Sequence, residues 1–64
     1  MLKEKLHDLR IKHDITQADL AAAVGVSSRA VKYWEHGERT PNLASLLALA
    51  RYFNVSTEYF LMED

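Results

Sequence analysis

Apolar and polar positions recur with helical periodicity through most of the chain, and the pattern divides it into five segments. Between Leu2 and His13, residues Leu2, Leu6 and Leu9 recur at helical spacing, while lysines and Asp8 fill the opposite side. This pattern is typical of an amphipathic helix. No segment shows the alternation of period two that predicts a half-buried strand. The sequence therefore predicts an all-α fold.

Capping residues mark the limits of the second and third predicted helices. Thr16 is a candidate N-cap, and Asp19 three residues later completes an approximate capping box. The segment QADLAAAV follows and ends at Gly25, a residue able to adopt the left-handed conformation that closes a helix. Ser27 is the next candidate cap, and its helix ends at Gly37 by the same reasoning. The short turn GVS joins these two helices.

Two more helices are predicted after the break at Thr40-Pro41-Asn42. The segment LASLLALARYF places five apolar residues on one face that is expected to form much of the core: Leu43, Leu46, Leu47, Ala50 and Phe53. Ser56 is a candidate cap for a short last helix, TEYFLM, whose Phe60 and Leu61 are expected to return to the bundle. The predicted architecture for residues 1–64 is a compact five-helix bundle that forms one domain.

The third predicted helix has one apolar face and one polar face. A rotation of about 100° per residue gathers its polar residues within an arc of about 140°. These are Ser28, Arg29, Lys32, Tyr33 and His36. Ala30, Val31 and Trp34 lie opposite and are expected to pack on Leu20, Ala21 and Val24 of the preceding helix. The polar face is then left free for a partner.

Composition and charge narrow the class of partner. The 64 residues are 48% hydrophobic and 27% charged, a balance typical of a small globular domain. The absence of cysteine excludes disulfides and thiolate metal sites, and suits the reducing cytoplasm, which is the expected location. No membrane span or signal-peptide core is present in the sequence. The formal net charge of -1 argues against a basic coat that binds nucleic acid without regard to sequence.

Two helices joined by a short turn at a glycine, with an exposed polar face on the second, indicate a helix-turn-helix at about residues 16–37. The segment from Thr16 to Leu61 also resembles the phage repressor/Cro-like regulators, the xenobiotic-response-element family. The resemblance rests on motifs that occur in order and at the family's spacing: Thr16-Gln17, Ala21, Gly25, Val31, Trp34, Glu35 with Gly37, Pro41, and NVSTEYFL. It implies a lambda-repressor-like DNA-binding domain and double-stranded DNA as the partner.

The resemblance also implies roles for particular residues. The positions that read bases or adjoining phosphates are Ser28, Arg29, Lys32 and Tyr33. The positions that hold the phosphate backbone are Gln17, Ser27, His36, Arg39 and Asn42. Arg29 is the strongest candidate, since a guanidinium offers two parallel donors to guanine O6 and N7. Glu35 is expected to pair with Arg10 of the first helix instead of meeting DNA.

Two departures from the family pattern keep other functions open. His36 stands where Asn, Arg or Lys is frequent, and Glu38 stands where a basic residue often follows the glycine. Both weaken the expected phosphate clamp. The primary interpretation is a bacterial or phage transcriptional repressor that binds a pseudo-palindromic operator. The alternatives are an antitoxin-like or restriction-controller autoregulator, and a protein-interaction module that has lost its affinity for DNA.

No catalytic function is expected. No Ser/His/Asp or Cys/His set has the context of a known catalytic motif, and a bundle this small offers little room for a substrate pocket. His7 and His13 have no matched carboxylate pair nearby in the sequence, so solvated histidines are expected in place of a metal site. No cofactor and no small-molecule substrate is predicted.

The C-terminal segment carries more aromatic and flexible apolar surface than a small core is expected to bury. Phe60 and Leu61 are assigned to the core, which leaves Tyr59 and Met62 as candidates for a homodimer interface. In the family that the chain resembles, dimers often form near the last helix. Such a dimer would place two recognition helices about 34 Å apart, on successive major grooves.

Overall fold

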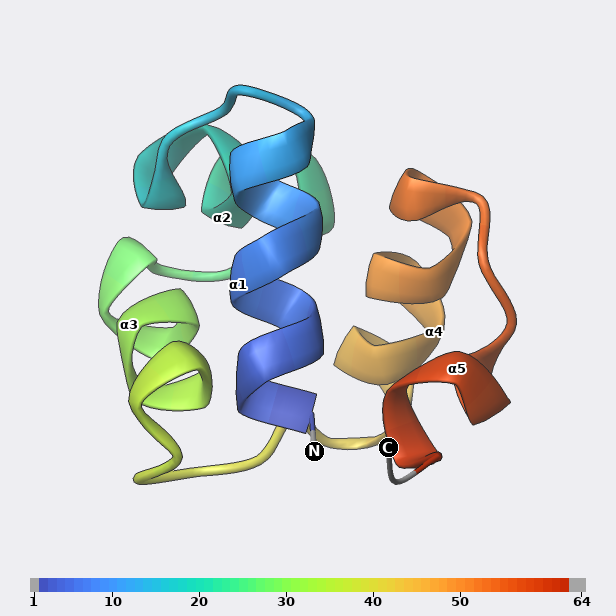
Figure 1. The fold of residues 1–64 in the computed structure, drawn as a ribbon. Coiled ribbons are helices and arrows are strands. Elements are labelled where there is room, and N and C mark those ends of the chain that lie inside the picture. Colours follow the sequence, from blue (N-terminus) through green and yellow to red (C-terminus); the bar gives the residue numbers. More distant parts are fainter. Residues whose placement is uncertain (1, 63–64) are drawn as a thin grey trace.

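The structure is a computed structural model that describes residues 2–62, and these residues form five helices and no strand. The helices are α1 (Leu2–Lys12), α2 (Gln17–Val24), α3 (Ser28–His36), α4 (Leu43–Phe53) and α5 (Thr57–Leu61). Figure 1 shows α1 between two groups, with α2 and α3 on one side and α4 and α5 on the other. The predicted all-α five-helix fold is confirmed.

The predicted caps are present and set the turns. Thr16 Oγ1 accepts from the Asp19 N–H at 3.0 Å, and Asp19 Oδ2 accepts from the Thr16 N–H at 3.1 Å, which completes the capping box of α2. Gly25 follows in the left-handed conformation with φ of 77°, so the chain reverses at once into the cap of α3. The Ser27 hydroxyl oxygen accepts from the Ala30 N–H at 3.2 Å. These contacts fix the angle at which α3 leaves α2.

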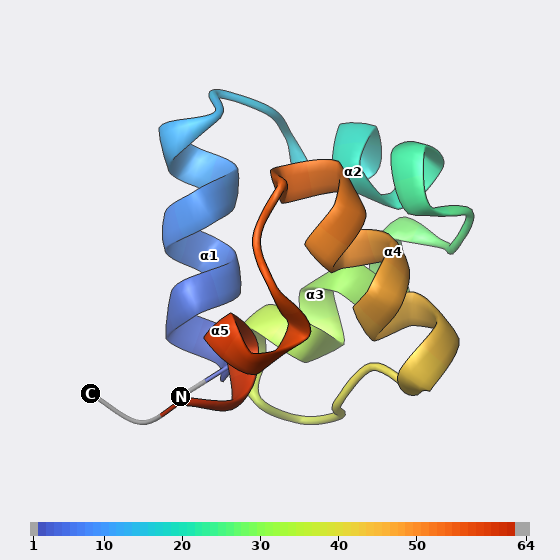
Figure 2. The same cartoon turned by 90° about the vertical axis from the view of Figure 1, so that its right-hand side faces the viewer.

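A single core lies where the five helices meet, and Figure 2 shows the turned view in which α5 lies in front of it. Val31 and Trp34 of α3 pack there with Leu20 and Ala21 of α2, as the polar and apolar faces predict. The other buried residues come from α1, α4 and α5: Leu6, Leu9, Leu46, Leu49, Ala50, Phe53 and Phe60. The orientation of α3 therefore depends on α1 as well as on α2.

The core face of α4 differs from the predicted one. Leu46, Ala50 and Phe53 are buried, but Leu43 is 71% exposed and Leu47 is also exposed, whereas Leu49, which was not assigned to this face, is fully buried. The four buried positions span an arc of about 100°, and Leu43 and Leu47 fall just outside one edge of it. The prediction for those two leucines was wrong, because the buried arc is centred between Leu46 and Phe53, whereas the predicted face is centred on Ala50.

Two smaller predictions also need correction. Phe60 is buried, but Leu61, which was expected to join it, is 65% exposed because α5 is short and turns the next residue outward. The first helix ends at Lys12 and not at His13, since Asp14 takes a left-handed conformation with φ of 55° that stops the helix. No helix within residues 2–62 has the length and apolar character that crossing a membrane requires.

Candidate nucleic-acid interface

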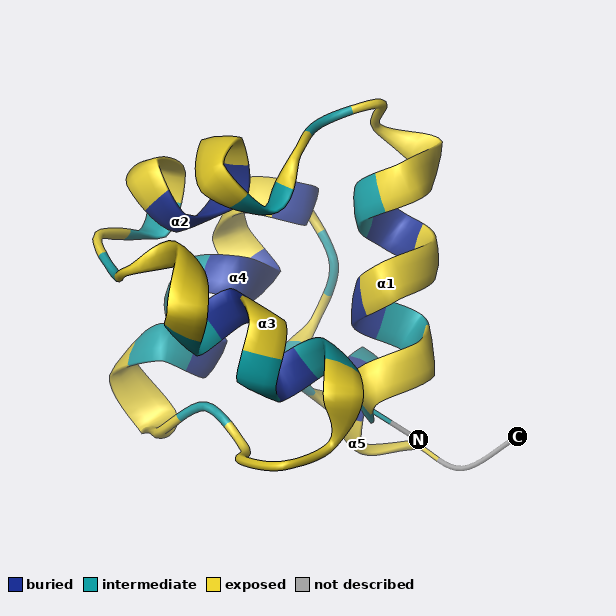
Figure 3. Ribbon diagram, turned by 90° about the vertical axis from the view of Figure 1, so that its left-hand side faces the viewer, coloured by how far each residue is buried: buried dark blue, intermediate teal, exposed yellow. Residues whose placement is uncertain are grey.

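The outer face of α3 is the exposed polar surface that the sequence predicts. Ser28, Arg29 and Lys32 are exposed, and Tyr33 is half-buried. Figure 3 shows α3 with buried residues directed toward the other helices and exposed residues outside. Because Val31 and Trp34 anchor the opposite face in the core, these four side chains sit on a helix that cannot turn in place.

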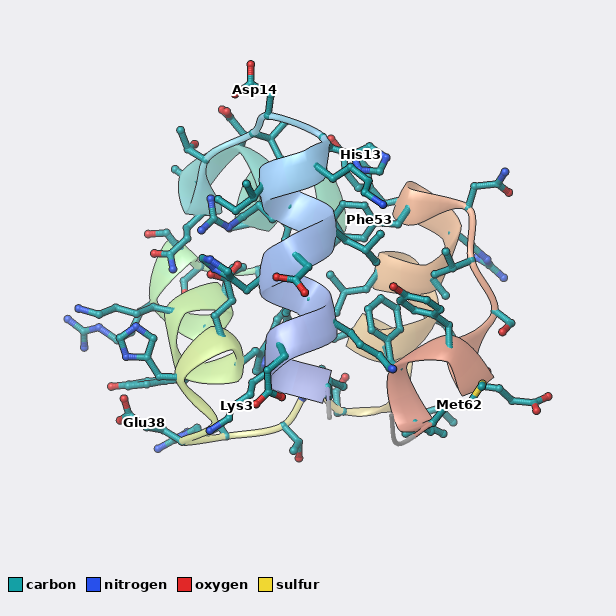
Figure 4. All side chains as sticks on the ribbon, viewed as in Figure 1. Lys3, His13, Asp14, Glu38, Phe53 and Met62 are labelled. Carbon is teal, nitrogen blue, oxygen red and sulfur yellow. The ribbon has the colours of Figure 1, made fainter. Side chains whose placement is uncertain are left out.

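An open groove of about 560 Å³ runs along this face. It is lined by residues from the start of α2, from α3 and from the loop after α3: Gln17, Ser28, Arg29, Lys32, Tyr33 and Glu38. The groove thus brings all four predicted base-reading residues together with Gln17. It also contains a carboxylate that the predicted DNA-contacting set does not include, that of Glu38, which lies beyond the end of α3 (Figure 4).

A second groove, of about 310 Å³, lies between α3 and the start of α4. It brings together three predicted phosphate-binding residues, Ser27, Arg39 and Asn42, along with Arg29 and Tyr33. The Ser27 and Asn42 side chains also cap helices, since Asn42 Oδ1 accepts from the Ser45 N–H at 2.9 Å. Each cap uses the side-chain oxygen as an acceptor, which leaves the hydroxyl or amide hydrogens available as donors.

The remaining predicted phosphate ligand, His36, lies apart from Arg39 and Asn42. It lines a third groove, of about 460 Å³, together with Arg10, Gln17 and Glu35. Its Nδ1 is 3.7 Å from Glu38 Oε1, and both side chains are largely exposed. A carboxylate therefore lies beside this histidine at the end of α3.

Glu35, on α3, is the centre of a polar cluster between α3 and α1. Its side chain is 3% exposed and accepts from Arg10 Nε at 2.6 Å and from Arg10 Nη2 at 3.0 Å. Arg10 Nη1 also donates to the Ile15 carbonyl at 2.9 Å, which ties the turn before α2 to the same cluster. The side-chain pair that the resemblance implied is therefore formed by two parallel hydrogen bonds.

Two further side chains converge on the same carboxylate. Gln17 Nε2 donates to Glu35 Oε1 at 3.2 Å, and His7 Nδ1 lies 3.1 Å from that oxygen. The sequence pattern predicts a solvated His7 and a phosphate-binding Gln17, and neither prediction includes a bond to Glu35. His13 also has partners, because its Nδ1 lies 2.9 Å from the Leu9 carbonyl oxygen and its ring packs edge-on against Phe53. Both histidines are exposed, as expected, but each also makes a contact that the sequence pattern does not predict.

The cluster favours the ionised form of Glu35. Burial raises the pKa of Glu35, but the hydrogen bonds from Arg10, His7 and Gln17 outweigh burial and hold the pKa below its ordinary value. The hydrogen bond to Glu35 raises the pKa of Arg10, against the opposing effect of burial. Among the described residues every buried side-chain nitrogen and oxygen has a partner, and no group of three or more His, Asp or Glu side chains gathers as a metal site would require.

The predicted dimer residues lie at the other end of the molecule. Met62 is 61% exposed, whereas Tyr59 is half-buried, packs against the core and has Lys5 Nζ 5.4 Å from its ring centre. Figure 4 shows Met62 on the side opposite Glu38 and the end of α3. Leu61, the preceding residue, is also exposed.

A short turn between two packed helices, with a fixed polar face on the second, defines a helix-turn-helix domain. A profile of the helix-turn-helix family matches residues 6–60, and the chain belongs to this family, whose named members are transcriptional regulators. The resemblance to phage repressor-like regulators of the xenobiotic-response-element type is confirmed.

The chain is 39% identical over 64 residues to the repressor protein C2 of Salmonella phage P22. It is 38% identical over 64 residues to a helix-turn-helix-type transcriptional regulator of Methanocaldococcus jannaschii. The alignments cover 100% and 98% of this chain, but 30% of the phage repressor and 97% of the archaeal protein. The chain therefore spans less than a third of the length of the phage repressor.

A crystal structure of the P22 c2 repressor in complex with a synthetic operator has the same fold. It matches with a TM-score of 0.94 at 39% identity, covering 100% of this chain and 97% of that chain. The lambda-repressor-like architecture expected from the sequence is confirmed by this similarity.

Proposed function

We propose that this domain binds double-stranded DNA in a sequence-specific manner and acts as a transcriptional regulator in the cytoplasm. The groove along α3 carries the proposal, because it places two cations and two neutral hydrogen-bonding side chains on one helix face, with Gln17 at the edge. A helix enters the major groove with such a face, where its side chains reach base edges. The similarity to an operator-bound repressor structure supports the same reading.

Each residue in the groove has a proposed role. Arg29 donates to guanine, Ser28 and Lys32 reach a base edge or phosphate, and Tyr33 packs against a thymine methyl. Gln17, at the N-terminus of α2, exchanges its bond to Glu35 for a phosphate oxygen, assisted by the free amides there. The remaining phosphate contacts come from Ser27, His36, Arg39 and Asn42.

We infer a homodimer on DNA, with contact through the exposed end of α5. An interface there leaves the α3 face of each copy free, because Met62 and the end of α3 lie on opposite sides of the domain (Figure 4). Two copies related by a two-fold axis read a site with two half-sites about 34 Å apart. Repression follows from occupation of a promoter that contains such a site.

The first experiment is selection of binding sites from a random duplex library, followed by affinity measurements for the best and a scrambled duplex at two salt concentrations. An enriched two-fold motif with clear preference over scrambled DNA is the expected result. Weak binding that salt abolishes, with no enriched motif, would overturn the proposal, since phosphate contacts alone produce that behaviour.

The dimer is tested separately with Met62→Glu, which places a charge in the proposed interface. We expect weaker binding to the two-half-site duplex and unchanged binding to a single half-site. Ile11→Glu is the matched control, because Ile11 is also exposed but lies near the opposite end of α1 from α5 (Figure 1). Equal loss in both variants, or none in Met62→Glu, would overturn the α5 interface without affecting the DNA proposal.

One observation favours a second candidate, a protein-interaction module. The Glu38 carboxylate lies in the same groove as Arg29 and Lys32, where a DNA phosphate would meet repulsion. An acidic peptide would meet the same repulsion, so a basic or neutral partner surface fits this alternative. A protein partner that binds the Arg29→Ala variant at full strength, together with no DNA binding by the parent, would establish this alternative.

An antitoxin-like or restriction-controller autoregulator would also bind DNA through α3, and would differ only in the promoter that it selects.

A further inference from the structure

Arg39 lies over the ring of Tyr33, although the two residues belong to different elements. The Arg39 guanidinium carbon is 5.2 Å from the centre of the Tyr33 ring. A cation at this distance is attracted by the negative face of an aromatic ring, and a guanidinium can also stack flat on it. The contact joins the loop after α3 to the outer face of the recognition helix.

The backbone holds Arg39 in this place. The Tyr33 carbonyl accepts from the Glu38 N–H at 3.0 Å and from the Arg39 N–H at 3.4 Å. Gly37 makes this return possible with a φ of 75°, and a Cβ there would approach Lys3 Cδ to 2.9 Å. The residue that covers the Tyr33 ring is thus bonded through its own main chain to Tyr33.

Tyr33 lines two of the three grooves of the candidate interface. It contributes to the groove with Lys32 and Gln17, and to the groove with Arg39 and Asn42. Its ring therefore lies between the surface assigned to bases and the surface assigned to phosphates. A ring already held in one orientation pays less ordering entropy when it contacts a base edge, and the Arg39 contact favours one orientation.

We propose that Arg39 is a positioning residue for base recognition, which holds the Tyr33 ring against a base edge in the major groove. The inference rests on the proposed DNA-binding function and adds a specificity role to a residue otherwise assigned to phosphate. A guanidinium stacked by its face keeps its N–H donors at the periphery. Arg39 thus contacts a phosphate and restrains Tyr33 at the same time, and its loss changes base preference as well as total affinity.

The contact is tested first without DNA, by NMR of the free domain. A side chain over a ring face has upfield-shifted protons, so the Arg39 Hγ and Hδ resonances are expected upfield of those of Arg51, an exposed arginine on α4. The shift should disappear in Tyr33→Leu. Arg39 resonances equal to those of Arg51 in the parent would overturn the proposal before any DNA is added.

The role is tested with Arg39→Lys, which keeps the charge but loses the planar group, and with Arg39→Ala. We expect Arg39→Lys to retain most of the salt dependence but to lose about 2- to 5-fold in preference at one base pair per half-site. In a Tyr33→Leu background, Arg39→Lys should change that preference no further. Arg51→Lys is the matched control and should leave the selected motif unchanged.

Two outcomes separate this inference from the proposed function. If the parent selects a motif and Arg39→Lys selects the same motif with the same preference at every position, Arg39 is a phosphate contact only and the inference fails alone. If the parent selects no motif, the proposed function fails and this role fails with it. A loss of preference in Arg39→Lys that persists unchanged in the Tyr33→Leu background would also overturn the coupling between the two residues.

Discussion

Arg10 and Glu35 join α1 to the recognition helix through two hydrogen bonds, with Arg10 Nε 2.6 Å from Glu35 Oε2 and Arg10 Nη2 3.0 Å from Glu35 Oε1. The two side chains are 12% and 3% exposed. Glu35 lies on α3, and Arg10 also donates to the Ile15 carbonyl. The pair therefore fixes the relative positions of α1, the turn before α2, and α3. A buried ion pair of this kind orients the two helices that it joins, and removing either partner leaves the other charge buried without compensation.

Glu35→Gln is expected to destabilise the fold by about 1.5–3 kcal/mol, the range measured for hydrogen bonds to charged groups. For a domain of this size each kcal/mol lowers the melting temperature by about 4–8 °C. Thermal unfolding at pH 7 measures the effect. Glu38→Gln, which removes an exposed carboxylate three residues away, is the control and should change stability by less than about 0.5 kcal/mol. Equal melting temperatures for parent and Glu35→Gln would contradict the structural role.

The same pair predicts how stability depends on pH. Since the folded-state pKa of Glu35 lies below its ordinary value, the unfolded chain binds the proton more readily. The contribution is therefore complete above the unfolded pKa of about 4.3 and is lost as the pH falls through the folded pKa. Between pH 7 and about pH 3 the parent should lose more stability than Glu35→Gln. Parallel curves of unfolding free energy against pH would refute this assignment.

Local features of the sequence predicted much of the fold. Capping side chains and helix-closing glycines act within four residues of their partners, so Thr16, Ser27 and Gly37 could be assigned from the sequence alone. The polar face of α3 was equally visible, because periodicity separates the two sides of a helix. The predicted core face of α4 is rotated by about 50° from the buried one, since the centre of a buried arc depends on where neighbouring helices lie. Leu49 was missed for that reason.

The spacing of residues along the sequence could not predict the side-chain contacts between residues that are far apart in the chain. His7 and Gln17 meet at Glu35, at separations of 28 and 18 residues, and no periodic signal links such positions. The Arg10–Glu35 pair was expected only through family resemblance. The position of Arg39 over Tyr33 depends on the conformations of the two side chains, which the sequence pattern does not specify. The residue types of the interface were therefore predictable, but their mutual arrangement was not.

Arg29→Ala and Gln17→Ala should affect DNA binding in different ways. Loss of a guanidinium that reads guanine removes about 1–3 kcal/mol of discrimination at one base pair, so the Arg29 variant should accept other bases there. Loss of Gln17 removes a phosphate contact and should weaken all duplexes alike. Affinities for the selected duplex and its single-base variants measure both effects. Arg51→Ala, on the last turn of α4, controls for the loss of a cation (Figure 1). If both variants bind every duplex as tightly as the parent, the residue assignment is wrong.

Glu38→Gln should strengthen DNA binding by about 1.5- to 5-fold, the range of an exposed charge interaction. The carboxylate lies in the groove with Arg29 and Lys32 and beside His36, so it repels the phosphates that those side chains attract. Its removal should also make the dependence of log K on log salt steeper. Glu58→Gln, outside the candidate nucleic-acid interface, makes the same change in net charge and should have a smaller effect on binding to a single half-site, which requires no dimer contact through α5. Weaker binding by the Glu38 variant would indicate that Glu38 itself accepts from a base, such as the cytosine amino group.

Asn42 combines two roles that one pair of variants can separate. Its Oδ1 caps α4 by accepting from the Ser45 N–H, and its amide hydrogens remain available to a phosphate. Asn42→Ala should cost about 1 kcal/mol of stability and also weaken DNA binding. Asn42→Asp keeps a good capping acceptor but presents a negative charge, so it should preserve the melting temperature and lose DNA affinity. An Asp variant that binds DNA as tightly as the parent would restrict Asn42 to its cap, because a carboxylate cannot donate to phosphate and would repel it at that distance.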